Sequence, residues 1–244
     1  MSTAPDRAVH ETHFWVIGAG GLGCPALLGL LSAGARRITI IDHDRVERHN
    51  LQRQVLFSSA DVGALKAEAA AHALRRREPR LQVQARVQRL DPESLAGVVE
   101  HAGSAAVVLE CTDAPALKFA ANDAALRSGT SVVIAAALGW QGQALAVHRA
   151  EACYRCIYES PPPAAAVTTC AEAGVLGAAV GMVGFLAAHL AAGVAGGQNG
   201  CGQLHRVDLL SGSARAARPT IRAGCPGPHA PRPSAVIGMP AQLP

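Results

Sequence analysis

The sequence predicts an α/β fold of the Rossmann type, a doubly wound and mostly parallel sheet with antiparallel C-terminal strands and a zinc knuckle. Three observations predict it. A glycine-rich segment at 18–23 follows one apolar run and precedes an Ala/Leu-rich helical pattern. Apolar runs then alternate with helical patterns as far as residue 138. This alternation is typical of parallel strands with helices on both faces, and a Cys-x₂-Cys pair at 153–156 follows them.

The first unit runs from an apolar strand at 14–17 through the glycines to a second strand that Asp42 ends. Gly18 permits a tight turn, Gly20 lets backbone N–H groups approach a phosphate, and Gly23 lets the helix lie close to the strand. The helix N-terminus adds partial positive charge. The Asp42 carboxylate can accept hydrogen bonds from ribose hydroxyls. The unit therefore predicts a nucleotide site, although a glycine turn that only closes a strand–helix corner has the same pattern.

The remaining elements follow from periodicity, helix formers and breakers. Strands are predicted at 37–41, 82–87, 105–110, 131–138 and 143–148, the last antiparallel, and helices at 22–33, 65–77, 92–101 and 116–127. Two short runs at 203–209 and 217–222 flank a Ser-Gly-Ser turn. We expect one domain over 14–229, between a loose arm at 1–13 and a Pro-rich tail at 230–244. A crossover linker at 159–172 contains three consecutive prolines.

Residues 173–197 contain no Asp, Glu, Lys or Arg, and the run is long enough to span a membrane. Its Ala/Gly-rich composition, the interrupting His189 and the lack of flanking basic or aromatic anchors favour a buried interface helix instead. We therefore expect no membrane contact.

Composition narrows the function classes. Half of the 244 residues are hydrophobic but only 3% are aromatic, which indicates a core of small residues. The net charge of +4 comes from scattered arginines, so we expect no nucleic-acid partner. The polar first fourteen residues lack an apolar leader, and the seven cysteines are an odd number. These features favour a cytoplasmic protein whose reduced thiols serve metal binding or chemistry.

Four side chains from separate segments are expected to meet at one edge of the sheet: Asp42, Arg53, Lys66 and Asp113. Two basic groups and a carboxylate suit a triphosphate with Mg²⁺, since the bases stabilise developing charge and Asp113 can hold the metal. Lys66 opens a helix, where its charge opposes the helix dipole unless an anion lies near. A nicotinamide enzyme would need only the glycines and Asp42, which leaves Arg53 and Lys66 unexplained.

The cysteines suggest two further sites. Cys153 and Cys156 have the spacing of a zinc knuckle, and Cys225 with His229 is the best remaining pair to complete four ligands. The alternatives are small buried hydrophobic residues or a redox pair. Cys170 precedes a helix, where a thiol pKa is lowered, so it is a candidate nucleophile; an inert packed thiol fits equally well. We interpret Cys24, Cys111 and Cys201 as structural.

These motifs together resemble the MoeB/ThiF/HesA adenylyltransferases, relatives of the ubiquitin-activating enzymes. The resemblance covers about residues 14–229, and its motifs occur in the same order as in the family. The residues that carry it are 18–24 (GAGGLGC), 42–44 (DHD), 50–54 (NLQRQ), Val62-Gly63 with Lys66, 111–113 (CTD), 153–156 (CYRC) and 169–175 (TCAEAGV).

The resemblance implies an ATP-dependent reaction with Mg²⁺. The C-terminal Gly-Gly carboxylate of a small β-grasp sulfur-carrier protein attacks the α-phosphate and forms an acyl-adenylate that later receives sulfur, for cofactor biosynthesis of the molybdopterin or thiamine type. By analogy the ATP site comprises Gly18, Gly20, Gly21, Gly23, Asp42, Asp44, Asn50, Arg53, Gln54, Lys66 and Asp113. The catalytic groups would be Arg53, Lys66, Asp113 for Mg²⁺, and Cys170 for sulfur transfer. A homodimer and a structural zinc are also implied.

The chain departs from the family pattern at three places. It begins too close to its first strand to carry the Arg-rich N-terminal helix of many members, and Ala114 replaces an Asn. Pro228 stands where the second zinc pair ends, so His229 must serve instead. With no rhodanese domain following, the sulfur donor is expected to be a separate protein. Two alternatives stay open: a catalytically weakened nucleotide-binding scaffold for a β-grasp partner, and an NAD-dependent oxidoreductase.

Overall fold

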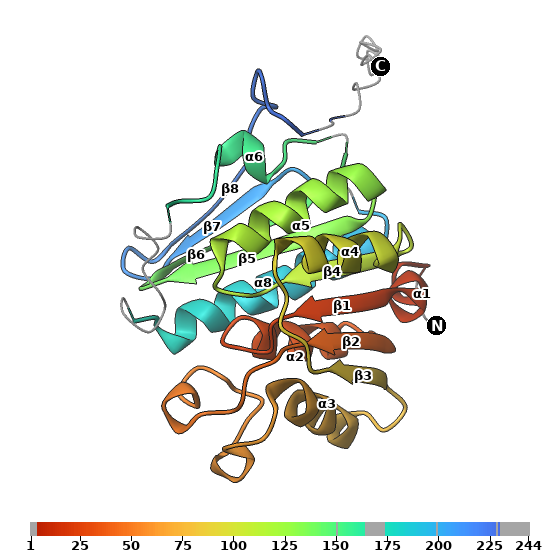
Figure 1. Ribbon diagram of the computed structural model, residues 1–244, viewed down its shortest axis with the longest axis vertical. Helices are drawn as coiled ribbons and strands as arrows, with labels where there is room; N and C mark the ends of the chain where they lie inside the picture. Colours follow the sequence, from red (N-terminus) through yellow and green to blue (C-terminus); the bar gives the residue numbers. More distant parts are fainter. Residues whose placement is uncertain (1–3, 150, 164–173, 199, 228, 230–244) are drawn as a thin grey trace, which may run out of the picture.

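A single eight-stranded sheet forms the centre of the computed structural model, which describes residues 4–149, 151–163, 174–198, 200–227 and 229 (Figure 1). Its strand order is β3-β2-β1-β4-β5-β6-β7-β8, the first five parallel and the last three antiparallel. The strands are β1 (His13–Ile17), β2 (Arg37–Ile41), β3 (Gln82–Arg86), β4 (Ala106–Glu110), β5 (Ser131–Leu138), β6 (Gln141–Val147), β7 (Leu204–Asp208) and β8 (Ser213–Ala217).

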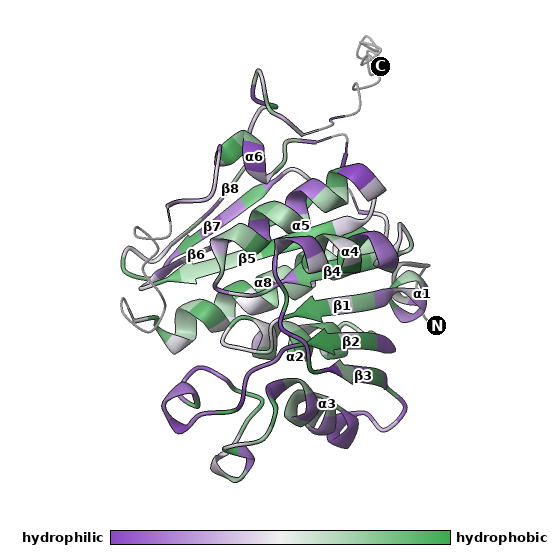
Figure 2. Ribbon diagram, in the orientation of Figure 1, coloured by the Kyte–Doolittle hydropathy of each residue, from purple (hydrophilic) through white to green (hydrophobic). Residues whose placement is uncertain are grey.

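Helices cover both faces of this sheet. The helices are α1 (Ala4–Glu11), α2 (Gly23–Ser32), α3 (Lys66–Arg77), α4 (Pro92–Ala102), α5 (Pro115–Ser128), α6 (Tyr154–Ile157) and α8 (Gly177–Ala195), with short 3₁₀ turns at Arg48–Asn50 and Ser59–Asp61. One buried cluster joins α2, α3 and α8 to the sheet, and a second joins α4 and α5 to its other face. In Figure 2 the central strands are the most hydrophobic part, whereas the loop after β2 is hydrophilic.

Local sequence explains where these helices begin and end. Asp91 caps α4 by accepting the backbone N–H of Ser94 at 2.8 Å, and Pro92 follows at the first helical position. Pro115 opens α5 in the same way. Gly129 ends α5 in the left-handed conformation, with φ of 76°, which glycine adopts without steric cost. Cap residues therefore define the two helices on the second face.

The predicted α/β fold is confirmed, and the strands at 37–41 and 131–138 have the predicted bounds. Two expectations are wrong. Residues 4–11 form helix α1 instead of a loose arm. Among residues 7–11, whose burial is described, Val9 is buried and belongs to the same cluster as α2 and α8. The last strand is Ser213–Ala217 rather than 217–222, because Asp208 accepts the backbone N–H groups of Leu210 and Ser211 and turns the chain early.

Other predicted regions lie partly outside the described residues. The structure does not describe the tail at 230–244 or most of the crossover linker, including Cys170. The domain bounds of 14–229 therefore stay a prediction.

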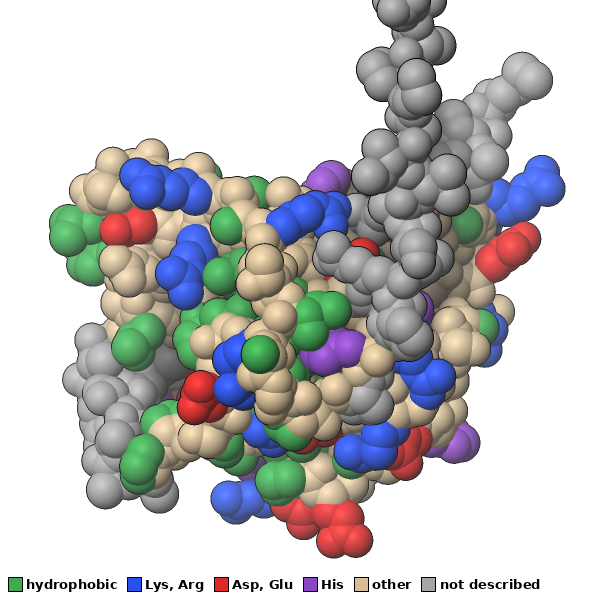
Figure 3. All heavy atoms as spheres, turned by 90° about the horizontal axis from the view of Figure 1, so that it is seen from above, with side chains coloured by type: hydrophobic (Ala, Val, Ile, Leu, Met, Phe, Trp, Pro, Cys, Tyr) green, Lys and Arg blue, Asp and Glu red, His purple; other side chains and the backbone are tan. Residues whose placement is uncertain are grey.

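On the face shown in Figure 3, the described Lys and Arg side chains are spread among neutral and acidic ones and form no continuous patch.

Helix α8 is the apolar helix expected from 173–197. By length and composition it could cross a membrane, but residues along it, including Val183, Ala187 and Ala191, lie in the same buried cluster as α2 and the sheet. Small residues allow the contact: a Cβ on Gly184 would lie 2.5 Å from the Leu22 carbonyl oxygen and 2.4 Å from the Pro25 ring. This packing favours the predicted buried helix over a membrane span.

Gly184→Ala and Gly181→Ala form a matched pair on α8. We expect Gly184→Ala to destabilise the protein by about 1–3 kcal/mol, since the added methyl group enters an already filled contact. Gly181 has open space, so its alanine variant should gain about 0.5–1 kcal/mol of helix stability. Urea unfolding measures both. Equal effects at the two positions would contradict the close α2–α8 contact.

Candidate nucleotide site and metal cluster

A cavity of about 1210 Å³ lies at the carboxyl ends of the parallel strands. It opens beside β1 and β4, where the strand order reverses; such a switch point is where open α/β sheets bind ligands. The predicted nucleotide-site residues that line it come from four segments: Gly18, Gly20, Gly21, Asp42, Asp44, Asn50, Arg53, Gln54, Lys66 and Asp113. The fold therefore brings together the side chains that the sequence places far apart. Gly23, the remaining residue of the predicted nucleotide site, does not line the cavity.

The glycine turn is possible only because two Cβ atoms are missing. Gly18 has φ of 90°, and a Cβ there would lie 3.1 Å from the backbone of Cys111. A Cβ on Gly23 would lie 1.9 Å from the Gly18 carbonyl oxygen. These approaches confirm the turn and helix-contact roles predicted for Gly18 and Gly23.

Asp42 supports this turn directly. Its carboxylate accepts the backbone N–H of Ala19 and that of Asp44, both at 2.7 Å. Burial raises the pKa of Asp42, while these two hydrogen bonds act in the opposite direction. Each carboxylate oxygen has further lone pairs, so a ribose hydroxyl could still be bound.

Lys66 lies at the start of α3, and it is almost fully buried. Its ammonium group contacts the carboxylate of Asp44 at 2.8 Å. Burial alone would raise the pKa of Asp44, but its hydrogen bond and ion pair with Lys66 outweigh burial and lower it. The sequence predicted only an anionic ligand near Lys66. In the structure Lys66 lines the cavity and is already paired with the carboxylate of Asp44.

The polar loop after β2 supplies a second basic group. Arg53 donates to the side-chain oxygen of Asn50 at 2.7 Å, and Asn50 is buried. Gln54 is 2% exposed, and its Oε1 has no hydrogen-bond partner among the described residues. Buried polar atoms are rarely left unpaired, so Gln54 has capacity for a ligand hydrogen bond in this cavity.

Asp113 follows β4 and is exposed at the cavity. Just before it in the chain, the backbone N–H of Cys111 donates to the Ile17 carbonyl at 2.9 Å, which places the Asp113 turn beside the glycine turn.

Burial raises the pKa of Cys24 and Cys111 to about 12 and that of Cys201 to about 11. These thiols are therefore poor nucleophiles, in agreement with their structural interpretation.

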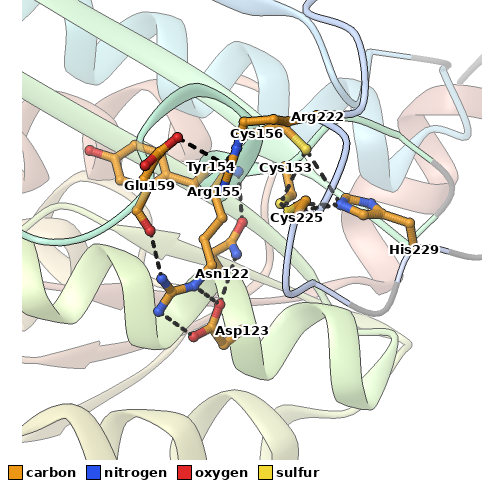
Figure 4. Close-up of polar contacts among 10 residues, drawn as sticks. All are labelled: Asn122, Asp123, Cys153, Tyr154, Arg155, Cys156, Glu159, Arg222, Cys225 and His229. Atoms are coloured by element: carbon orange, nitrogen blue, oxygen red, sulfur yellow. Dashed lines mark hydrogen bonds and ion pairs between the residues drawn. The ribbon is translucent and has the colours of Figure 1, made fainter.

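Three cysteines and one histidine form a cluster outside the cavity, the set predicted from the sequence (Figure 4). Cys153 Sγ lies 3.8 Å from Cys156 Sγ and 3.7 Å from Cys225 Sγ. His229 Nε2 lies 3.3–3.6 Å from the three sulfurs. A tetrahedral ion about 2.3 Å from each sulfur separates sulfurs by about 3.8 Å, so the four atoms fit zinc.

The segment that carries Cys153 and Cys156 is fastened to helix α5. Arg155 binds both carboxylate oxygens of Asp123, at 2.7 and 2.9 Å, and the Tyr154 backbone N–H donates to Asn122 at 2.7 Å (Figure 4). Bidentate pairing fixes the orientation of the arginine. The metal-binding segment is thus positioned by side chains of a core helix.

Two features of the cavity escaped the sequence analysis. Glu110 and Lys118 form an ion pair beneath the Asp113 turn, at 2.6 Å. The signal was a glutamate at the end of an otherwise apolar strand. A polar row of Gln143, Arg206 and Arg215 also lines the cavity; strand register places these residues side by side on β6, β7 and β8. Their order could not be read without that register.

The fold and the cavity define a class: a Rossmann-type α/β protein whose switch-point cavity combines a glycine turn with two basic side chains and carboxylates. Residues 3–227 match the ThiF family, and the chain belongs to that family.

Two yeast relatives carry the description adenylyltransferase and sulfurtransferase UBA4. The protein of Ogataea parapolymorpha is 40% identical over 175 residues, which are 71% of this chain and 44% of the relative. That of Saccharomyces cerevisiae is 41% identical over 180 residues, or 73% and 40% of the two chains. The chain thus spans less than half the length of the curated relatives that it matches.

Solved structures show the same fold. Escherichia coli MccB with ATP has a TM-score of 0.79 and 19% identity, and the match covers 92% of this chain and 69% of MccB. PaaA has a TM-score of 0.72 and 16% identity, over 88% of this chain and 66% of PaaA.

The cluster geometry predicts about one zinc ion per chain, because four ligands complete one tetrahedral site. Cys153→Ser should lower the zinc content and the midpoint of thermal unfolding, and a chelator should lower the same midpoint. Cys201→Ser is the matched control and should keep its zinc. Elemental analysis and calorimetry measure both quantities; full stability of metal-free protein would contradict the site.

Proposed function

We propose that the protein is an ATP-dependent adenylyltransferase that activates the C-terminal Gly-Gly carboxylate of a small ubiquitin-like sulfur carrier. The observation that carries this proposal is the meeting of Arg53, Lys66 and Asp113 around the glycine turn in one cavity. Membership of the ThiF family and the description of the UBA4 relatives support it.

The proposed chemistry is a displacement at the α-phosphate of ATP. A carboxylate oxygen of the carrier forms a bond to the α-phosphorus, the bond to the bridging oxygen breaks, and pyrophosphate leaves with the electron pair. Arg53 and Lys66 would stabilise the negative charge on the phosphates, and Asp113 would hold Mg²⁺. Asp42 would bind the ribose, Asn50 would contact the phosphates together with Arg53 and Lys66, and Gln54 would belong to the same ATP site. The protein's contribution is mainly positioning and charge.

The cavity has room for a second substrate. Its volume of about 1210 Å³ exceeds the roughly 300–1,000 Å³ of a single small-molecule site. The polar row on β6, β7 and β8 is part of the cavity lining, and its Arg206 and Arg215 are exposed and paired in register. An extended peptide tail that enters along this row would reach the glycine turn with its carboxylate.

Several further parts of the proposal come from the family resemblance. Sulfur would be delivered by a separate donor protein, and the product would serve cofactor synthesis of the molybdopterin or thiamine type. Zinc would occupy the cluster of three cysteines and His229. A cytoplasmic homodimer is proposed as well; Met182 and Phe185, apolar side chains exposed on α8, support a contact between copies.

Two alternative functions predict different binding behaviour. A weakened scaffold would bind nucleotide and a β-grasp partner without forming an adenylate. An NAD-dependent oxidoreductase would bind NAD tightly and ATP not at all. The relation to MccB, which was solved with ATP and with MccA, raises a peptide as the activated substrate in place of a carrier protein.

Carrier-dependent exchange of labelled pyrophosphate into ATP tests the adenylation step. Exchange should require a Gly-Gly carrier, and Asp113→Ala should lower it by about a hundredfold or more while ATP binding persists. Glu93→Ala, which removes an exposed carboxylate on α4 outside the cavity, is the control and should exchange normally. Absence of exchange with every Gly-Gly carrier or peptide tested would reject the enzyme proposal.

Cys170 lies outside the described residues, and its role stays a prediction. We expect Cys170→Ser to keep pyrophosphate exchange at the wild-type rate and to lose transfer of sulfur to the carrier, because the thiol acts after adenylation. Mass spectrometry of the carrier distinguishes the carboxylate from the thiocarboxylate. Loss of exchange in this variant would place Cys170 in the first step and contradict the assignment.

A further inference from the structure

An ion pair is enclosed within the protein directly beneath the Asp113 turn. Glu110 is the last residue of β4 and is 0% exposed, and Lys118 lies in the first turn of α5 and is 5% exposed. Their charged groups are 2.6 Å apart. Two ions removed from water are expensive to bury, and an apolar pair of similar volume is often no less stable. The pair therefore calls for an explanation other than stability.

Most hydrogen bonds that this pair makes to the rest of the protein go to Thr112, a residue of the turn. Lys118 donates to the Glu110 carboxylate, to the Thr112 carbonyl at 2.7 Å and to the Ala135 carbonyl at 2.7 Å. The second oxygen of Glu110 accepts the backbone N–H of Thr112 at 3.0 Å and also its hydroxyl. Both backbone polar groups of Thr112 are thus bound by the pair.

Asp113 is the next residue, so its backbone is held on one side by this pair. On the other side Pro115 begins α5, the helix that carries Lys118. The ammonium group has three donors and three acceptors, which leaves no donor for a substrate. Lys118 is among the residues that line the cavity, but because its three donors are already used it acts on a ligand through the turn and not by donating a hydrogen bond to it.

The position of Lys118 is also unfavourable with respect to the dipole of helix α5. A cation in the first turn of a helix opposes the helix dipole, and Lys118 occupies that turn in α5. Glu110 compensates for this charge from the neighbouring strand. Neither residue is thus explained by helix formation or by core packing, and both are explained by the turn that they bind.

We propose that Lys118, acting with Glu110, is a positioning residue that holds the Asp113 turn in the geometry needed to bind the metal–ATP complex. The inference rests on the proposed function, since it assigns the turn to metal–ATP binding. Residues that orient a metal ligand typically change metal affinity by about 10–100-fold when they are removed.

The decisive variant is the double substitution Glu110→Leu with Lys118→Met. It replaces the ion pair by apolar side chains and leaves no buried charge unpaired, so the protein should stay folded. We expect the Mg²⁺ concentration for half-maximal pyrophosphate exchange to rise by about 10–100-fold. Isothermal calorimetry of ATP with Mg²⁺ should show the same loss without any turnover. Lys118→Met alone should show this loss together with a lower unfolding midpoint, because Glu110 is left unpaired.

Val99→Ala is the control for general loosening of this face. Val99 is fully buried on α4 and does not line the cavity, so it should lower the unfolding midpoint and leave the Mg²⁺ requirement unchanged. A folded double variant with the wild-type Mg²⁺ requirement would overturn the positioning role. A wild-type protein that binds Mg²⁺ and ATP without exchange would reject the adenylation proposal alone; one that binds no nucleotide would reject both.

Discussion

The parallel pairing of β1 with β4 is the constraint on which the candidate site depends. Their register sets Ile17 opposite Glu110, so the chain leaves both strands at the same level of the sheet. The glycine turn and the Asp113 turn therefore lie side by side, and the missing Cβ of Gly18 allows the approach to the Cys111 backbone. Other cavity residues come from the loop after β2, from the start of α3 and from strands β6, β7 and β8.

Charge is balanced locally on each side of this junction. After β2, the buried Lys66 pairs with Asp44, and after β4 the buried Lys118 pairs with Glu110. The two pairs differ in exposure, since Asp44 is half exposed whereas Glu110 is enclosed. An entering phosphate can therefore compete for Lys66, while the Lys118 pair remains part of the framework.

Much of this arrangement could be predicted from residue chemistry. Apolar strands, helix caps and the glycine spacing are local signals, and few residue types bind metal, so Cys153 and its three partners could be chosen from spacing. Helix α1 and strand β8 could not, because α1 has only eight residues, with Val9 alone buried among residues 7–11, and the residues of β8 are largely exposed. The Glu110–Lys118 pair and the polar row on β6, β7 and β8 depend on strand register and on contacts between elements, which composition does not encode.

The cluster at Cys153 and Cys225 has a consequence for the unfolded chain. These residues are 72 positions apart, and the segment between them contains α8 and the two last strands. An ion bound by both would close this segment into a ring. A covalent cross-link over a loop of that length removes about 4 kcal/mol of chain entropy from the unfolded state, and a tightly held metal acts in the same sense. The antiparallel half of the sheet would then owe part of its stability to loop closure.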